Sequence, residues 1–388
     1  MHDNITMVNT YHSWDRVHLP CGFDLRFSGD SGISWGMMTV ETSRTSLADR
    51  LRLPLRELVV APMVDQSELA FRMLCRTYGA TLCFTPMLHA RLFSESAKYR
   101  RAKFTSAPED RPLIVQFCGN DPEMVLAAAR HVEGQCEAVD LNLGCPQNIA
   151  KRGRYGSFLL EHADLICRIV AHLCENLATP VSCKIRILPS REKTLELARR
   201  IEGAGCSLLT VHGRTKEQNK ERVGACDWDI IRDIKQCVQI PLVANGGVGT
   251  FEEAQRCRAA TGADAIMSAE AILENPALVA GMDPAPSPTR MALDYLDMAE
   301  RYPDTKKVVQ AHLFKLLHGP LCAHPEFRQQ ISRPHRVRDF GVYLAAMRVC
   351  VMELEALHGD CEDNRCHPHR KSGTYYPWYG RHRKKVGV

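Results

Sequence analysis

Residues 138–146 read Ala-Val-Asp-Leu-Asn-Leu-Gly-Cys-Pro, and this stretch decides the fold. Its short apolar run is typical of a strand buried in a parallel sheet, and its Gly-Cys-Pro ending is typical of a turn. The same pattern, an apolar run followed by polar or glycine residues, recurs along the chain. We expect eight such strands, at Leu58–Ala61, Thr81–Thr85, Leu113–Phe117, Ala138–Leu141, Val181–Ile185, Leu208–Val211, Pro241–Ala244 and Ala263–Met267.

Amphipathic segments separate most of the predicted strands. They lie at Ser67–Thr77, Pro122–Val132, Leu160–Leu177, Lys193–Ala204, Trp228–Gln236 and Phe251–Thr261. Strands that alternate with helices predict a parallel sheet in an α/β protein. An open, doubly wound sheet would carry Gly-x-Gly-x-x-Gly after its first strand, whereas Ala61-Pro62-Met63 stands there. We therefore expect a (β/α)8 TIM barrel.

The pattern after Pro276 is helical only. Amphipathic helices are expected at Met291–Arg301, Thr305–Leu317 and Val337–Leu357, with turns at Pro303, Pro320, Pro325 and Pro334. The expected organisation is a disordered leader over 1–50, a barrel over 51–285, a small helical domain over 286–360 and a flexible basic tail over 361–388.

The composition places the chain among soluble globular proteins. Of its 388 residues, 45% are hydrophobic and 24% are charged, and no apolar stretch approaches the roughly 20 residues that span a bilayer. The first 40 residues hold no apolar run of a secretory signal. The 17 cysteines are odd in number and scattered through apolar segments. This indicates reduced thiols, and we expect a cytoplasmic protein that is also compatible with the nucleus.

The tail over 361–388 carries an excess charge of +5, which equals the net charge of the whole chain. A basic tail on a neutral body favours a polyanionic partner, and a solvated tail explains the charge equally well. Its Cys361, Cys366, His367 and His369 lack the usual Cys-x2-Cys pairs, so we expect no metal site. The aromatic and basic ending over 375–385 fits either non-specific RNA affinity or nuclear localisation.

The chemistry of such a barrel belongs at the carboxyl ends of its strands. Gln116, Lys184 and His212 come from the carboxyl ends of the third, fifth and sixth predicted strands and would face one central space. An amide, a cation and an imidazole around a flat ring are what a reduced flavin needs. Gly246 and Gly247 follow the seventh strand, where such barrels usually bind phosphate through backbone N–H groups.

Cys145 is the strongest candidate for catalysis. Most thiols in a cysteine-rich chain are structural, but Cys145 lies between Gly144 and Pro146 in a turn just past the fourth strand. A thiol of ordinary pKa stays protonated at neutral pH and can donate a proton. The basic, glycine-containing segment over 151–156 is placed to close over an anionic ligand.

Three segments together carry a resemblance to a known family. They are 141–147 with Lys151-Arg152-Gly153, 61–65 (Ala-Pro-Met-Val-Asp) and 210–215 (Thr-Val-His-Gly-Arg-Thr). The chain resembles the tRNA-dihydrouridine synthases from about Leu55 to Leu357, most closely the eukaryotic class that modifies D-loop positions 16 and 17. The resemblance implies an FMN-bearing barrel, a helical tRNA-binding domain, reduction of the flavin by NADPH (with NADH as an alternative), and a tRNA partner without a membrane. We expect a monomer.

The resemblance also implies a role for each matching residue. Cys145 would donate a proton to uracil C5 while reduced FMN delivers hydride to C6. Residues around the flavin ring and ribityl chain would be Ala61, Pro62, Met63, Gln116, Lys184 and His212. Residues around the flavin phosphate would be Asn245, Gly246, Gly247, Ala269 and Glu270. Uracil contacts would be Asn142 and Arg186, and cations for tRNA phosphates would be Lys151, Arg152, Arg154 and Arg214.

Two features depart from a simple match. Many flavin barrels end the eighth strand with Gly-Arg, whereas Ala269-Glu270 stands here, so we expect only backbone contacts with phosphate at this position. On the helical domain, Lys306, Lys307, His312 and Lys315 recur at helical spacing. They would form either a second tRNA contact or a solvated helix face.

Two other functions stay open on the residues alone. A flavin barrel that acts on a small molecule would share the flavin residues, but it should lack the helical domain and the basic segment. A non-catalytic RNA-binding protein would not need Cys145, Lys184 and His212, and it would not be yellow when purified.

Overall fold

The computed structural model describes residues 46–219, 222–333 and 337–358. The predictions for the leader up to residue 45 and for the tail from residue 361, with its four candidate metal ligands, lie outside these residues. Helix α1 (Leu47–Arg50) begins within the range expected as leader, because Leu47 and the following Leu51 are buried.

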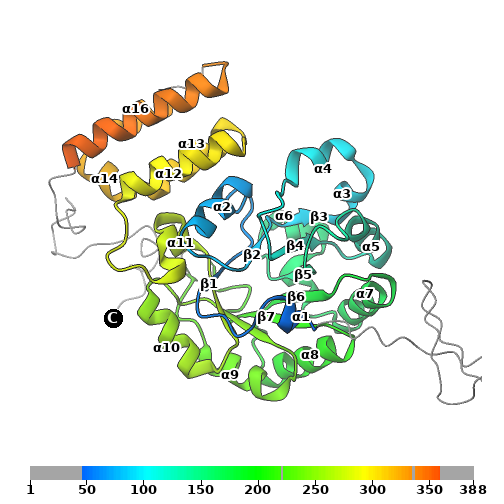
Figure 1. The fold of residues 1–388 in the computed structure, drawn as a ribbon. Coiled ribbons are helices and arrows are strands. Elements are labelled where there is room, and N and C mark those ends of the chain that lie inside the picture. Colours follow the sequence, from blue (N-terminus) through cyan, green and yellow to red (C-terminus); the bar gives the residue numbers. More distant parts are fainter. Residues whose placement is uncertain (1–45, 220–221, 334–336, 359–388) are drawn as a thin grey trace, which may run out of the picture. The chain divides into compact units, whose positions relative to one another are not determined.

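Eight parallel strands form a closed barrel, which confirms the predicted (β/α)8 class (Figure 1). The ring closes because β1 pairs with β9 on one side and with β2 on the other, while β2 pairs with β4. The strands are β1 (Leu58–Val60), β2 (Cys83–Phe84), β4 (Leu113–Cys118), β5 (Ala138–Leu143), β6 (Val181–Arg186), β7 (Leu208–His212), β8 (Leu242–Asn245) and β9 (Ala265–Ser268).

A short strand that the sequence did not predict, β3 (Leu88–His89), also pairs with β4. Strand β2 pairs with the first residues of β4, and β3 pairs with Phe117 and Cys118 at its end. Thr85-Pro86-Met87 separates the two short strands. Since proline has no N–H to donate to a ladder, Pro86 accounts for the interruption.

The six predicted crossover helices are present, and each of their ends lies within three residues of the expected one. Their starts follow ordinary capping chemistry: the side chain of Asp121 caps one helix, and Thr250 with Glu253 forms a capping box in another. The helices are α2 (Leu69–Thr77), α5 (Pro122–Arg130), α7 (Ala163–Asn176), α8 (Arg191–Gly203), α9 (Trp228–Cys237) and α10 (Phe251–Thr261). Shorter elements are α3 (Ala90–Glu95), α4 (Ala97–Lys103), α6 (Asn148–Gly153), η1 (Gly156–Leu159), α11 (Glu270–Glu274) and η3 (Pro276–Ala280).

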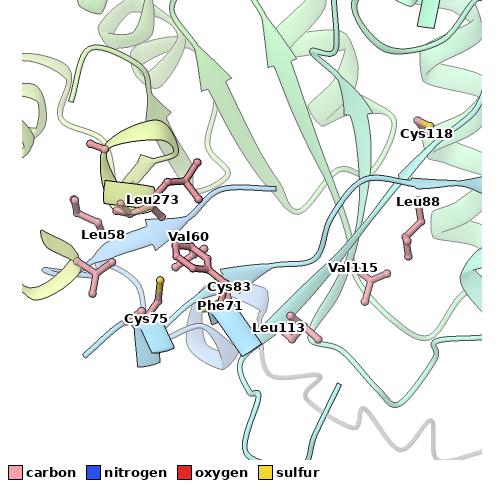
Figure 2. Close-up of a cluster of buried hydrophobic side chains, with 14 of the residues drawn as sticks. Leu58, Val60, Phe71, Cys75, Cys83, Leu88, Leu113, Val115, Cys118 and Leu273 are labelled. Atoms are coloured by element: carbon pink, nitrogen blue, oxygen red, sulfur yellow. The ribbon is translucent and has the colours of Figure 1, made fainter. Parts of the chain in front are cut away.

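Alternation along the strands divides the buried side chains into two clusters. The larger cluster lies between strands and helices, where Leu58 and Val60 of β1 meet Phe71 and Cys75 of α2 (Figure 2). The smaller cluster holds the alternate residues, which face the barrel interior: Leu47, Leu51, Leu55, Val59, Ala61, Leu82, Phe84, Ile114, Ala138, Leu208, Val243, Ala265 and Met267. Since its three leucines at 47, 51 and 55 precede the first strand, they close the amino-terminal end of the barrel.

Among the described residues from 288 on, the regular elements are all helices, as predicted. The helices are α12 (Pro288–Arg301), α13 (Lys306–Leu316), α14 (His318–Ala323), α15 (Phe327–Ser332) and α16 (Phe340–His358). Helices α14 and α15 were not predicted. Pro320 was expected in a turn, but it lies in the first turn of α14, where its missing N–H is tolerated. No helix in the described ranges is long and apolar enough to cross a membrane.

These helices contact the barrel through α2. Glu68, at the start of α2, accepts hydrogen bonds from Tyr295 Oη at 3.0 Å and His312 Nε2 at 3.0 Å. His312 also stacks on Phe71 at 4.6 Å between ring centroids. His312 and Lys315 are therefore buried, so the expectation that they share an exposed face with Lys306 and Lys307 is wrong.

Candidate active site

A cavity of about 350 Å³ lies at the carboxyl ends of the strands, where the sequence placed the chemistry. Nine of the eleven predicted cofactor residues line it, and the other two, Met63 and Gln116, do not. The lining consists of Ala61, Pro62, Pro146, Gln147, Lys184, Arg186, His212, Arg214, Gln218, Asn219, Val223, Asn245, Gly246, Gly247, Val248, Met267, Ser268, Ala269 and Glu270. Its mixture of small residues and cations fits a flat, anionic ligand.

Lys184, the fourth residue of β6, presents a buried ammonium group to this cavity. Its Nζ donates to Asn245 Oδ1 at 3.0 Å, and Asn245 Nδ2 donates to the carbonyl of Met267 at 3.0 Å. Burial, and secondarily the charge of Arg186, lowers the pKa of Lys184 to about 8. Two of its three N–H donors find no acceptor among the described residues. This side chain therefore favours an anion in the cavity.

His212, at the end of β7, faces the same space as a neutral imidazole. Burial and the charges of Arg186, Lys184 and Arg214 hold the pKa of His212 well below its usual value. Arg214 Nη1 lies 3.3 Å from His212 Nε2. Because arginine can only donate, we assign Nε2 as the acceptor and Nδ1 as the protonated nitrogen.

Gly246 and Gly247 form the turn after β8 with φ values of 102° and 78°, which glycine adopts without strain. A Cβ on Gly246 would lie 2.7 Å from His212 Cδ2, so a side chain would collide with the imidazole. Within the described part of the chain, the N–H groups of these two glycines have no acceptor. Free N–H groups in such a turn make a concave site for an anion.

The residues after β9 place a carboxylate, that of Glu270, in the part of the cavity wall where phosphate binding was expected. Ala269 and Glu270 line the cavity where the sequence placed them, and Glu270 begins α11. Arg214, predicted to contact tRNA at the surface, is instead buried in the cavity wall. Its Nε and Nη2 donate to the carbonyl of Gly224 at 3.3 and 3.0 Å. Arg214 therefore does not share an exposed surface with Lys151, Arg152 and Arg154.

Cys145 lies half-buried in the loop after β5, between cavity residue Pro146 and Gly144. Its N–H donates to Asn142 Oδ1 at 3.0 Å, and its carbonyl accepts from the N–H and hydroxyl of Ser157. Gly156 packs against this turn, because a Cβ there would lie 2.7 Å from the Cys145 carbonyl oxygen. Burial raises the pKa of the Cys145 thiol, so it is protonated at neutral pH. The thiol itself does not line the cavity.

Arg186 ties the Cys145 loop to the loop after β7. Its Nε donates to the carbonyl of Gly144 at 2.9 Å, and its Nη1 donates to the carbonyls of Thr215 and Gln218. Burial, with the charge of Arg214, lowers the pKa of Arg186 to about 10, so it stays charged at neutral pH. Its Nη2 has no partner among the described residues and is available to a ligand.

The other predicted residues do not line the cavity. Gln116 is buried, and its Oε1 accepts a hydrogen bond from Asn142 Nδ2 at 2.8 Å. Met63 accepts hydrogen bonds from the N–H groups of Gln66 and Ser67 through its carbonyl. Lys151 and Arg152 are exposed on α6, and Arg154 is exposed just after it.

Sequence reasoning missed several polar residues of this region. Asp140 and Ser182 lie in the barrel interior and bond to each other at 2.7 Å. Trp228 Nε1 donates to the carbonyl of Gly246 at 3.1 Å and so fixes the glycine turn. An acidic residue within an otherwise apolar strand was the signal for Asp140. The contact of Trp228 had no signal, because it depends on how α9 packs.

The observed groups fit FMN, the cofactor that the resemblance implies. The buried ammonium of Lys184 with unfilled donors suits the anionic edge of a reduced flavin, and the open N–H groups of Gly246 and Gly247 suit a phosphate. The glycine turn and the lysine belong to neighbouring parts of one cavity. The residues present therefore match the two ends of this cofactor.

Comparison with known proteins gives a consistent result. The family model described as "Dihydrouridine synthase (Dus)" matches residues 59–319. A rat protein named "tRNA-dihydrouridine(16/17) synthase [NAD(P)(+)]-like" is 47% identical over 297 residues, covering 76% of this chain and 67% of the rat protein. Proteins named "tRNA-dihydrouridine(16/17) synthase [NAD(P)(+)]" are similar too. The Schizosaccharomyces pombe protein is 40% identical, covering 82% of this chain and 84% of its own length. The Saccharomyces cerevisiae protein is 44% identical, covering 74% and 70%.

Proposed function

This chain belongs to the dihydrouridine synthase family, and from that premise we propose that it reduces uridines to 5,6-dihydrouridine at positions 16 and 17 of the tRNA D-loop. The names of the rat and yeast relatives support the two positions and the use of a nicotinamide reductant. The chain spans about two thirds of the rat relative, so the activity is proposed for the part that the two share.

One observation carries this proposal: a buried cation, a neutral imidazole and a glycine turn meet at one cavity, beside a protonated thiol. Lys184 and His212 would hold the ring of FMN, and Asn245, Gly246 and Gly247 would surround its phosphate. Arg214 would supply the positive charge for the phosphate, because Glu270 stands where many flavin barrels have an arginine. When bound and reduced by NADPH, the flavin supplies the hydride for uracil C6.

Cys145 would act as the acid of the reaction. Its burial keeps the thiol protonated at neutral pH, so a proton is available for uracil C5. Hydride at C6 and this proton at C5 together saturate the C5–C6 bond. The thiolate left behind takes a proton from water, which restores the starting state.

Arg186 and Asn142 would orient the base. Arg186 has a free Nη2 beside the Cys145 loop, and the second N–H of Asn142 has no acceptor among the described residues. A carbonyl oxygen of uracil suits such donors. We propose that the target base is unstacked from the tRNA and inserted into the cavity, because a flavin at this depth is out of reach of a stacked base.

Exposed cations in the segment that follows Cys145 would bind the tRNA backbone. Lys151, Arg152 and Arg154 lie on and just after α6, in the segment that follows Cys145. They would contact phosphates without reading the sequence. We propose that α12–α16 form a further tRNA-binding surface, whose orientation selects the uridines.

The variant Cys145→Ala tests the role of the thiol. We expect the purified variant to keep bound flavin and its reoxidation by air, and to lose dihydrouridine formation by at least about a hundredfold, the usual contribution of a general acid. The assay measures dihydrouridine in tRNA by mass spectrometry. Cys167→Ala is the matched control, because Cys167 is a half-buried thiol on α7. Full activity of Cys145→Ala would remove the proposed acid.

Site selection is tested in cells that lack this protein. Dihydrouridine should disappear from positions 16 and 17 of their tRNA and persist elsewhere in the D-loop. Loss at other positions instead, with 16 and 17 intact, would contradict the proposed positions while leaving the chemistry in place.

A further inference from the structure

Asp140 is a buried carboxylate inside the barrel, linked to the loop of Cys145 through two side chains. It is the third residue of β5, in register with Gln116 on β4 and Ser182 on β6. It is fully buried, as are these two neighbours. Ser182 Oγ donates to Asp140 Oδ1 at 2.7 Å, and Gln116 Nε2 donates to Asp140 Oδ2 at 2.9 Å.

A continuous chain of hydrogen bonds leads from Asp140 to Cys145. Gln116 uses its Oε1 to accept from Asn142 Nδ2 at 2.8 Å. Asn142 Oδ1 then accepts from the N–H groups of Gly144 at 3.2 Å and Cys145 at 3.0 Å. Two side-chain amides thus connect the carboxylate to the backbone that carries the candidate acid, and we call this chain the relay.

The direction of the relay is fixed from both ends. An ionised carboxylate only accepts, so Gln116 must turn its NH2 group toward Asp140. A backbone N–H only donates, so Asn142 must turn its oxygen toward Cys145. These two requirements agree at the bond between Gln116 and Asn142. A side chain that could only donate at position 140 would break the agreement, because one of the two amides would then have to reverse.

A carboxylate at this position is not what barrel packing requires. Interior positions nearer the amino-terminal end hold Ile114, Ala138 and Leu208, and an apolar residue would extend that layer. The charged group that faces Asp140 is Lys184, but the ammonium of Lys184 bonds to Asn245 and not to Asp140. Burial raises the pKa of Asp140 to about 6. The fold is therefore less stable with the ionised form, which indicates a role other than packing.

We infer that Asp140 is a positioning residue for Cys145: as a hydrogen-bond acceptor it sets the orientation of the amides of Gln116 and Asn142, and through them it holds the loop that presents the thiol. The inference rests on the proposed role of Cys145. It extends that role to a residue that contacts neither the cavity nor the thiol.

The first test compares Asp140→Leu with Asp140→Asn. Leucine removes the acceptor, whereas asparagine keeps it, because its oxygen can face Gln116 and its NH2 group can face Ser182 Oγ. In Asp140→Leu we expect the Cys145 loop to loosen, so that iodoacetamide alkylates Cys145 about tenfold faster in the purified protein, as the loss of one hydrogen bond to a buried group implies. Single-turnover uridine reduction should fall by about as much. Asp140→Asn should stay near the wild-type rates.

Peptide mass spectrometry provides internal references for this experiment. Cys167 and Cys322 are half-buried thiols outside the relay, and their alkylation rates should not change. Reduction of the bound flavin by NADPH should also stay constant, because the relay acts on the thiol and not on the reductant.

The second test reverses the direction of the relay and does not depend on Asp140→Leu folding. In Asn142→Asp, a carboxylate faces Gln116 Oε1, so the amide of Gln116 must flip and set its oxygen against Asp140. We expect faster alkylation of Cys145 and a less stable protein. Adding Asp140→Asn should restore both properties toward wild type, because the new amide can donate to the flipped Gln116 and still accept from Ser182.

The outcomes separate the inference from the proposed function. Unchanged Cys145 alkylation in Asp140→Leu, or an Asn142→Asp/Asp140→Asn protein no better than Asn142→Asp, would overturn the role of Asp140. If the alkylation pattern is as expected but wild-type protein forms no dihydrouridine, then the proposed function fails and the relay stands.

Discussion

At the scale of single residues, the charge states in the cavity follow from burial. That Lys184, His212 and Asn245 line the cavity could be predicted, because the strand ends place them at the mouth of the barrel. Asp140 could not, since its partners come from neighbouring strands and only the register of β4, β5 and β6 brings them together. Arg214 was predicted as a cation for tRNA phosphates, but it is buried, with its Nη1 3.3 Å from His212 Nε2.

Asp140→Asn should stabilise the protein in a pH-dependent way. The folded pKa of about 6 lies above the ordinary 3.8, so protonation favours the fold, and this contribution is complete below 3.8 and is lost as the pH rises through 6. At pH 7.5 this pKa difference means that the ionised carboxylate lowers the free energy of unfolding by about 3 kcal/mol. Asparagine carries no charge and removes this destabilisation. Urea unfolding at pH 7.5 and pH 4.5 measures the change. An equal effect of the variant at both pH values would contradict the buried, pKa-shifted carboxylate.

At the scale of elements, long periodic segments were predictable and short ones were not. Helix α10 begins and ends at the residues that its pattern predicts, Phe251 and Thr261. Strand β3 has two residues and α14 and α15 have six each, which is too short for periodicity to reveal. The contact of α13 with the barrel was misjudged because a sequence shows spacing but not neighbours: Glu68 lies more than two hundred residues from His312.

Glu68→Ala should destabilise the contact between α2 and the C-terminal helices. The change leaves Tyr295 Oη and His312 Nε2 buried without their partner, which costs about 3 kcal/mol in the free energy of unfolding. Tyr295→Phe removes one bond of the same cluster and should cost about 1 kcal/mol. Urea unfolding of both variants checks the ranking, and a Glu68→Ala protein as stable as Tyr295→Phe would contradict it.

The same cluster has a defined pH dependence. Burial alone would raise the pKa of Glu68, but the facing His312 lowers it below its usual 4.5. The cluster therefore stabilises the fold above pH 4.5, and that contribution is lost as the pH falls through the lower folded pKa. The deficit of Glu68→Ala relative to wild type should accordingly shrink in strongly acidic solution.

At the scale of the whole molecule, the barrel class was predictable from the recurrence of one pattern, and the closing pairs between β1, β9, β2 and β4 follow from the parallel strand order. Which cations can contact tRNA depends on which side chains are exposed on a shared surface, and the periodicity of the sequence does not reveal that. Among the predicted cations, Lys151, Arg152 and Arg154 share one exposed segment, whereas His312 and Lys315 are buried.

The triple variant Lys151→Ala/Arg152→Ala/Arg154→Ala should weaken tRNA binding. Removing three phosphate contacts should make the dependence of log Kd on log salt concentration shallower by about 2 to 3. Flavin reduction by NADPH should not change. Filter binding at several salt concentrations measures the slope, with Arg256→Ala on α10 as an exposed control. A slope equal to that of the wild type would place the tRNA elsewhere.

Leu47, Leu51 and Leu55 close the amino-terminal end of the barrel, so its cavity opens at the carboxyl ends of the strands. Any ligand of this cavity therefore enters and leaves at the carboxyl ends of the strands. The nicotinamide reductant and the nucleobase proposed above would share this one entrance.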